Sequence, residues 1–354
     1  MSQAIGANTR VITSVEDAYN VVPTLSAVKS GIVTPFSSES LQKTQALTDS
    51  KVILNSRDSR KPARGNYETG GDLSTELNAQ MFALLKYAIG GSTTVDSLSA
   101  TIAPNNASVG TPPYTHTFKI GSIPSFVLEK KFTDLTTPKF HQYTGCKISR
   151  LSMDVKTDGL VDMRAGIMGA DMIVAANSMA KSGADQNGFD LAYIHKPFES
   201  FELLAADLKI GGSAVAYISS LNINLENNTD GSVYIVGGTG SRKEMPAGII
   251  KLSGKISCLF SDTAGADSSA LITDAVAGTE RSIDITFTRG SGAGTVGNEK
   301  LRIVLPEILL AVNTPPINGY GGLFVEFDYT AFYENSSEAT TLMAVLTNSS
   351  APRY

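Results

Sequence analysis

The chain of 354 residues carries a formal net charge of −5, and 42% of its residues are hydrophobic. That share of apolar side chains supports a folded core and excludes a disordered chain, while the length suits two domains of about 150 residues each. The mild acidity argues against non-specific nucleic-acid binding through a strongly basic face, although it permits a local basic patch. The 32 Gly, the many Ser, Thr and Asn, and the absence of Trp favour a mainly β protein with many turns.

No segment of the sequence predicts export or a membrane span. The N-terminal stretch has no apolar core and carries Glu16 and Asp17, unlike a signal peptide. No apolar run approaches the ~18 residues that a spanning helix needs. We therefore expect a protein that is made in a cytoplasm and is not inserted into a membrane.

The cysteines and histidines predict neither a disulfide framework nor a metal centre. Cys146 and Cys258 are far apart in the chain, so we interpret them as two separate buried or half-buried thiols. His116, His141 and His195 show none of the spacings of metal-binding motifs. His116 lies on the apolar face of a predicted strand, which favours a packed histidine over a metal ligand.

The sequence also lacks the motifs of catalytic and phosphate-binding sites. The Gly-rich runs 237–243 and 289–300 do not lead into a helix whose N-terminus could bind an anion, so we interpret both as flexible hairpin loops. No pair of carboxylates lies in an apolar setting that would raise a pKa for acid–base work. We predict no enzymatic activity, no catalytic residue, no metal site and no cofactor.

In chain order, residues 1–50 show little periodicity and include Pro23 and Pro35. We interpret them as an N-terminal arm that becomes ordered against another surface. Residues 51–180 form the first predicted β-domain.

The first domain opens with a short apolar run at residues 52–54, which predicts a strand, and a polar segment follows it. The only convincing amphipathic helix comes next, with apolar residues that recur at a period of about 3.6. Asp72 or Ser74 can cap its first turn, and Gly90-Gly91 ends it. The apolar stripe consists of Leu73, Leu77, Met81, Leu84, Leu85, Ala88 and Ile89.

Alternating apolar and polar residues predict strands in most of the remaining chain. A linker at 181–198 separates the first domain from a second β-domain at 199–354, which shows no comparable amphipathic helix. An Asp-Gly pair at residues 158–159 provides a hairpin turn in the first domain. The predicted strands cover residues 114–128, 140–155, 160–170, 216–226, 249–260, 282–288, 300–310 and 323–333.

One pattern occurs on both sides of the linker. Residues 146–159 and 216–231 share an Ile-Ser-x-Leu strand that runs to an Asp-Gly turn. A true duplication would make each half one copy of the same β-domain. Amphipathic strands also resemble one another by chance, so the sequence leaves both interpretations open.

A cluster of charged residues precedes the predicted helix and overlaps its start. The cluster is either a solvated loop or a contact between subunits. In a contact, both signs of charge would pair with an identical neighbour and fix the register of the two chains. The cluster consists of Arg57, Asp58, Arg60, Lys61, Arg64, Glu68 and Asp72.

Several stretches together resemble the tail tube proteins of tailed bacteriophages. Residues 63–78 (ARGNYETGGDLSTELN), followed by an apolar helix and Gly-Gly, look like the helix entry of that family. Residues 114–132 and 143–169 resemble its paired strands, and residues 299–350 are similar to its closing segment. The order and spacing of these motifs carry the resemblance over nearly the whole chain.

The resemblance implies a structural virion protein with two β-sandwich or half-barrel domains and at least one flanking helix. Its strands would join those of its neighbours into a continuous barrel, and stacked rings would form the tail tube through which double-stranded DNA passes. Assembly would occur in the bacterial host cytoplasm, with the tape measure protein, the tail terminator and baseplate proteins as partners. The length and the possible duplication favour three chains in a pseudo-hexameric ring over six chains in a hexameric one.

Two alternatives are open. Another β-rich phage component, such as a baseplate or capsid-decoration protein, would form closed assemblies rather than long filaments. A carbohydrate-binding β-sandwich module would expose a platform of clustered aromatic side chains, for which a chain without Trp offers little.

Overall fold

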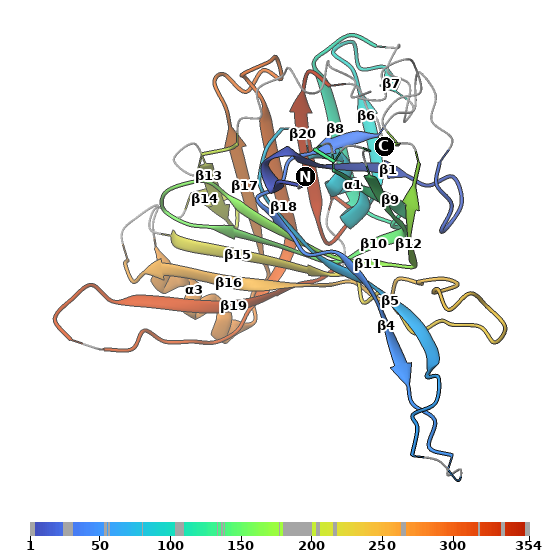
Figure 1. Ribbon diagram of the computed structural model, residues 1–354. Helices are drawn as coiled ribbons and strands as arrows, with labels where there is room; N and C mark the ends of the chain where they lie inside the picture. The colour runs from blue at the N-terminus through green and yellow to red at the C-terminus, as the bar shows by residue number, and fades with distance from the viewer. Residues whose placement is uncertain are drawn as a thin grey trace.

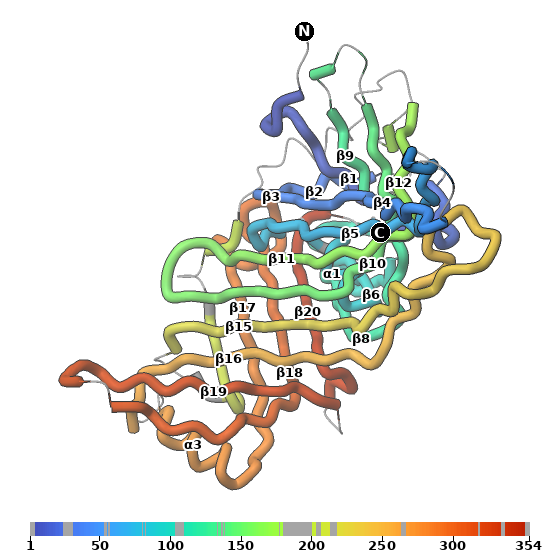
Figure 2. The backbone as a smooth tube through the Cα atoms, turned by 60° about the horizontal axis from the view of Figure 1, so that its bottom comes forward, coloured from blue at the N-terminus to red at the C-terminus, as the bar shows by residue number. Residues whose placement is uncertain are grey.

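The computed structural model of the chain is mainly β, as predicted, with helices α1 (Phe82–Ile89) and α3 (Ser268–Ala277) and a 3-10 turn at Gly6–Asn8. The strands join into one large antiparallel sheet that bends into two layers around a shared core (Figures 1 and 2). The structure describes residues 4–23, 31–52, 55, 57–79, 81–102, 110–132, 134–135, 137, 139–176, 178–179, 200–202, 206–214, 218–262, 267–317, 319–333 and 337–350.

The lower layer in Figure 1, which we call the floor, is a broad row of antiparallel strands. They follow one another in the order β4, β5, β11, β10, β15, β16 and β19, and the short β3 lies in line with β4 along β5. The bounds are β3 (Ser38–Glu39), β4 (Gln42–Thr48), β5 (Ala63–Glu76), β11 (Asp162–Gly169), β10 (Lys139–Val155), β15 (Ile218–Glu226), β16 (Lys251–Leu259) and β19 (Phe324–Ala331).

The upper layer covers one face of the floor, and its strands run steeply across the floor strands (Figure 2). Its order is β13, β17, β18, β20, β8 and β6, with the short β14 and β7 at its two ends. The bounds are β13 (Ala206–Ile210), β14 (Ser213–Ala214), β17 (Arg281–Thr288), β18 (Lys300–Leu310), β20 (Met343–Asn348), β8 (Tyr114–Ile120), β6 (Gly90–Val95) and β7 (Thr101–Ile102).

Two long strands, β10 and β18, connect the floor to the rest of the sheet. The first half of β10 pairs with β9 (Phe126–Phe132) and β12 (Asp171–Ala175), and β9 in turn pairs with β1 (Thr9–Val15), which pairs with β2 (Ile32–Thr34). The second half of β10 enters the floor between β11 and β15. β18 likewise pairs first with β20 and then with β19. Among the described strands the pairings never return to their starting strand, so the sheet remains open.

The strand pairings follow the same plan twice along the chain. The first set is β1, β2, β4, β5, β9, β10, β11 and β12, and the second set is β13 to β20 in the same order. Every pairing within the first set recurs between the counterparts in the second. In both sets a helix follows at the same point, α1 after β5 and α3 after β16.

The two similar stretches noted in the sequence are not counterparts in this plan. They lie in β10 and β15, which pair directly with one another, Leu151 opposite Leu225 and Met153 opposite Ile223. The counterpart of β10 is β18. The two stretches are alike because neighbouring strands that place one face on the same core show the same alternation.

The predicted helix is wrong over its first half. β5 continues to Glu76, and α1 begins only at Phe82. Leu73 and Thr75 are buried while Ser74 between them is more exposed, so the chain here follows the period of a strand that pairs with β11. Asp72 and Ser74 are therefore strand residues and not helix caps.

The end of that helix is confirmed. Gly90 is its C-cap, with φ of 99°. A Cβ at this position would lie 2.5 Å from the carbonyl oxygen of Gly121, so only glycine fits. The second half, in which no comparable amphipathic helix is expected, contains the short and weakly amphipathic α3. This helix is capped by the Asp267 side chain and ended by Gly278 in the left-handed conformation.

Residues 1–50, expected as an arm, contribute β1 to β4 to this chain's own sheet, and Val11 and Ile12 are fully buried. The strands predicted from alternation correspond to β8 to β11 and β15 to β19. The strand expected at residues 52–54 is not seen at Val52, which is exposed and outside any strand, and residues 53–54 lie outside the described residues. The predicted linker at 181–198 also lies outside them.

The core between the layers includes a stacked aromatic pair. The rings of Tyr87 in α1 and Phe126 in β9 lie 4.3 Å apart and nearly parallel, and both residues are fully buried. Such a pair contributes both burial and ring stacking to the stability of the fold.

Replacing Phe126 with Ala should lower the free energy of unfolding by ~3–5 kcal/mol, because it leaves a cavity in this core. The matched control is Phe324→Ala at the half-exposed end of β19, which should cost less than ~1 kcal/mol. Chemical denaturation followed by circular dichroism measures both. Equal losses would contradict the placement of Phe126 in the core.

Candidate functional site

The candidate site is a β-hairpin that projects from the edge of the floor. β4 and β5 pair from Gln42↔Gly70 to Thr48↔Ala63 and carry their connection well away from the rest of the molecule (Figure 1). Most residues of β4 are exposed. A hairpin this exposed cannot be held by core packing at its tip, so its surface is available to a partner.

The structure brings most of the predicted charged cluster together on this hairpin. Arg57, Asp58, Arg60 and Lys61 lie at the tip between the two strands, and all of them are exposed. Arg64 and Glu68 are exposed residues of β5. These six residues thus lie on one exposed hairpin, and their role in contacts between subunits stays a prediction.

Asp72 is separated from the cluster. It lies farther along β5, on the outward face of the floor, where its carboxylate accepts hydrogen bonds from Arg150 at 2.9 Å and Arg164 at 2.7 Å. The hydrogen bond from Arg164 lowers the pKa of Asp72 below its ordinary value, and its effect outweighs that of burial, which would raise the pKa. Asp72 therefore holds neighbouring floor strands together rather than belonging to the tip.

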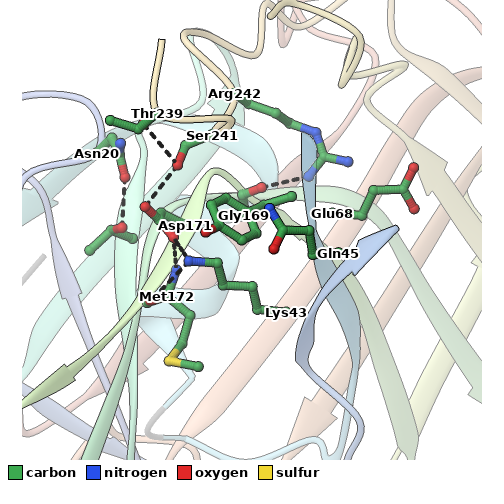
Figure 3. Close-up of polar contacts among 12 residues, drawn as sticks. Asn20, Lys43, Gln45, Glu68, Gly169, Asp171, Met172, Thr239, Ser241 and Arg242 are labelled. Carbon is green, nitrogen blue, oxygen red and sulfur yellow. Dashed lines mark hydrogen bonds and ion pairs between the residues drawn. The ribbon is translucent and has the colours of Figure 1, made fainter. Parts of the chain in front are cut away.

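The base of the hairpin is fixed by a polar network that sequence reasoning missed (Figure 3). Lys43 of β4 forms an ion pair with Asp171 of β12 and lies 3.7 Å from the centre of the Tyr67 ring. Asp171 also accepts a 2.7 Å hydrogen bond from the hydroxyl of Ser241. The network thus joins the hairpin to β12 and to the connection between β15 and β16.

Arg242 anchors this connection, residues 227–250, to the hairpin base. It is buried and donates a 2.6 Å hydrogen bond to the carbonyl oxygen of Gly169 (Figure 3). It also donates a 2.9 Å hydrogen bond to the carbonyl oxygen of Thr69. The amide of Tyr67 donates to the carbonyl oxygen of Gly240 at 2.8 Å. The Gly-rich run 237–243 is therefore a loop, as predicted, but one that is docked on β5 and β11. No local signal could reveal it, because its partners lie far away in the sequence.

The outward face of the floor is polar across its middle. Because the strands are in register, side chains form rows that cross them, while the alternate residues are buried against the upper layer. One row is Ser74, Arg164, Ser152, Asn224, Ser253 and Thr330. The next row is Glu76, Asp162, Asp154, Asn222, Lys255 and Asp328.

The described residues contain no group of three or more His, Cys, Asp and Glu that could hold a metal ion. His116 is a packed histidine, as predicted, and hydrogen-bonds Thr94 at 3.0 Å and Asn348 at 3.1 Å. Burial lowers the pKa of His116 to about 4, so the ring is neutral at physiological pH. Cys146 and Cys258 are both free and buried, which confirms their interpretation as separate thiols. In the described part of the chain, no helix is long and apolar enough to cross a membrane.

The network at the hairpin base predicts a pH dependence of stability. Burial alone would raise the pKa of Asp171, but hydrogen bonds from Lys43, Ser241 and the Met172 amide outweigh it and hold the pKa below its ordinary value of 3.8. The ionised carboxylate therefore stabilises the fold above that value, and the contribution is lost as the pH falls through the folded-state pKa.

Asp171→Asn should therefore be less stable than the wild type near neutral pH, and the difference should shrink below about pH 4. Lys43→Met should show the same pattern, and the double variant should lose little more than either single variant. Denaturation curves over this pH range test it. A difference that stays constant with pH would contradict the role of the carboxylate.

Comparison with known proteins identifies a family. A model of the family described as phage tail tube protein matches residues 6–331, a range that contains the hairpin, the floor and both helices. The search of curated proteins found no match. The chain therefore belongs to the phage tail tube protein family and is a structural component of a phage tail, not an enzyme.

Proposed function

We propose that copies of this chain form rings, that the rings stack into a hollow tail tube, and that the outward face of the floor lines the lumen through which double-stranded DNA passes. The observation that carries the proposal is the floor, a sheet with one buried face, one polar face and two open edges. An open edge readily pairs with another strand, and joining the floors of neighbours into a ring removes every such edge.

The charges on the outward face suit a channel for DNA. Arg150 and Arg164 are both paired with Asp72, and Lys255 lies 3.4 Å from the carboxylate of Asp328. The carboxylates of Asp72, Glu76, Asp154, Asp162 and Asp328 outnumber these three cations on the face. The face is therefore net acidic and repels the DNA backbone. The DNA would then slide without sticking.

The repeated pairing plan supports a ring of three chains. If each set of strands occupies one of six equivalent positions, three chains complete a pseudo-hexameric ring, and six chains would be needed if each chain filled one position. The first unit would then begin at β1 and include the segment predicted as an arm, and the second would lie within residues 199–354. We propose this duplication as the origin of the chain.

The charged tip of the hairpin is proposed as a contact between subunits. Arg57, Arg60 and Arg64 are exposed residues of the hairpin. The hairpin projects from the edge of the floor, where the next subunit of a ring would lie (Figure 1). Charged pairs at such a rim select the correct neighbour and register more than they add affinity.

As a tail component, the protein would be assembled in the bacterial host cytoplasm with the tape measure protein, the tail terminator and baseplate proteins. The family favours this function over a carbohydrate-binding module. Another β-rich tail, baseplate or capsid-decoration component would form closed assemblies and no tubes.

The test is electron microscopy of the wild type and of the variant with Arg57, Arg60 and Arg64 all replaced by Glu. The wild type should form hollow tubes. The variant should assemble poorly because its charges are reversed at the contact, while its circular dichroism and denaturation midpoint stay near wild-type values.

Replacement of the same three residues with Lys keeps the charge and is the matched control, which should assemble more readily than the Glu variant. Normal tubes from the Glu variant would contradict the contact. Closed wild-type rings that do not stack would contradict the tube.

A further inference from the structure

One strand pairing in the floor joins the first set of strands to the second and has no counterpart elsewhere among the described strands; we call it the joint. β10 of the first set pairs with β15 of the second, and this pairing joins the two sets within the floor. The counterpart of β10 is β18, and the counterpart of β15 is β4, which the short β3 extends along the same edge of the floor. These two strands lie at opposite edges of the floor, so a single chain cannot pair them.

The registers identify residue counterparts in the two sets. Where β10 and β18 enter the floor, Ile148 pairs with Ile167 and Ile308 pairs with Ala331. A bulge in β10 between Ile148 and Arg150 makes Leu151 the next buried residue, as Leu310 is in β18.

The match extends through the strands to the free edge. Leu225 lies opposite Leu252 in the second set. Leu41 holds the same place in the first set, opposite Gly71 in the register of β3 and β4 with β5. Leu41 and Leu225 are buried to the same degree, at 2% and 1% exposed. Since Leu225 pairs with Leu151, Leu310 of a second copy would lie opposite Leu41. This pairing would replace the hydrogen bonds that the backbone of Leu41 forms with Glu39, Lys130 and Tyr143 of its own chain.

The exposed fractions of two corresponding residues indicate that the edge at the end of β18 is not covered by a described strand of its own chain. Met153 of β10 is 4% exposed because β15 covers it. Val312, which holds the corresponding place two residues after Leu310, is 60% exposed. Its backbone continues along β19, since the amide of Ala311 donates a 2.8 Å hydrogen bond to the carbonyl oxygen of Asp328. An extended apolar edge of this kind is covered by a strand in a stable assembly.

The projecting hairpin has a counterpart too, in the connection at residues 227–250. Arg242 of that connection hydrogen-bonds Thr69 where β5 pairs with the end of β11, and it hydrogen-bonds Gly169 at that end of β11 (Figure 3). In the second set, the corresponding ends of β16 and β19 carry Ile249 and Tyr333, which are 89% and 59% exposed. The hairpin of a second copy is the segment that would cover them.

We propose that β3 and β4 of one copy pair antiparallel with the end of β18 and residues 311–314 of the next copy, Leu41 opposite Leu310 and Ser40 opposite Ala311, with the hairpin covering Ile249 and Tyr333. The proposal rests on the ring-forming function and deepens it by naming the two edges that meet. It is a heterologous, head-to-tail contact, which is the kind that closes rings.

Disulfide cross-linking tests the register. Ser40→Cys and Ala311→Cys in one chain should give covalent oligomers on oxidation of assembled tubes, because residues directly opposite on antiparallel strands lie within disulfide reach. Both residues are exposed, and the native Cys146 and Cys258 are buried and do not compete. Gln42→Cys with Leu309→Cys is a second pair in the same register, for use if the first pair prevents assembly.

Two controls bracket the result. Ser152→Cys with Asn224→Cys, the corresponding pair inside the chain, should form an intrachain bridge. Ser38→Cys with Ala311→Cys, displaced along the strand, should cross-link much less than the matched pairs.

Tubes without cross-links in either matched pair would overturn the proposed joint and leave the tube function intact. Cross-links without tubes would support the joint and contradict the tube. A protein that forms no tubes and no cross-links would contradict both the proposed joint and the tube function.

Discussion

The constraint on which the structure depends is that the unpaired N–H and C=O groups at the edges of a β-sheet need hydrogen-bond partners. The floor is wide, its strands are in register, and it ends at β4 on one side and at the end of β18 on the other. The backbone groups of an edge strand have no partner within the sheet and form a ready template for another strand. A monomer with two such edges is prone to association. In a ring of copies, one edge of each copy pairs with the opposite edge of the next copy, so no edge is left unpaired.

Buried and outward-facing residues alternate along the floor strands, so one face of the floor packs against the upper layer and the other forms the polar surface. Buried residues such as Leu151, Met163 and Phe327 pack against the upper layer, while their neighbours Ser152, Arg164 and Asp328 face outward. Slipping one strand by a residue would exchange these faces, so burial of one face fixes the register of the other. The packing that stabilises the subunit is thus the same packing that produces a continuous polar surface. In the proposed tube this surface would form the wall of the lumen.

Local patterns predicted most of the strands, because alternation is a property of a few neighbouring residues. They failed in the first half of the predicted helix, where Leu73 and Leu77 have helical spacing. There β5 continues to Glu76 and pairs with β11, so tertiary contacts favour the strand. α3 was missed because it is short and weakly amphipathic, although Asp267 and Gly278 mark its ends.

The candidate site was predictable only in part. The tip residues Arg57 to Arg64 follow one another in sequence, so their common location could be inferred. The contacts of Lys43 with Asp171 and of Arg242 with Thr69 join segments that are distant in the chain, and only the folded sheet brings them together. The two stretches of similar sequence lie in β10 and β15, which pair with one another and are not counterparts in the repeated plan. The counterparts β10 and β18 share a pairing plan and little sequence, so local patterns do not reveal the proposed duplication.

The most direct measurement of the central claim is cryo-electron microscopy of purified tubes with averaging along the filament, to count the chains in each ring. The account predicts three chains per ring, with six repeats of the floor strands around a lumen lined by the row of residues that includes Asp154 and Asp162. Six chains per ring would contradict the assignment of two equivalent units to each chain. A lumen lined by any other surface would contradict the role of the floor.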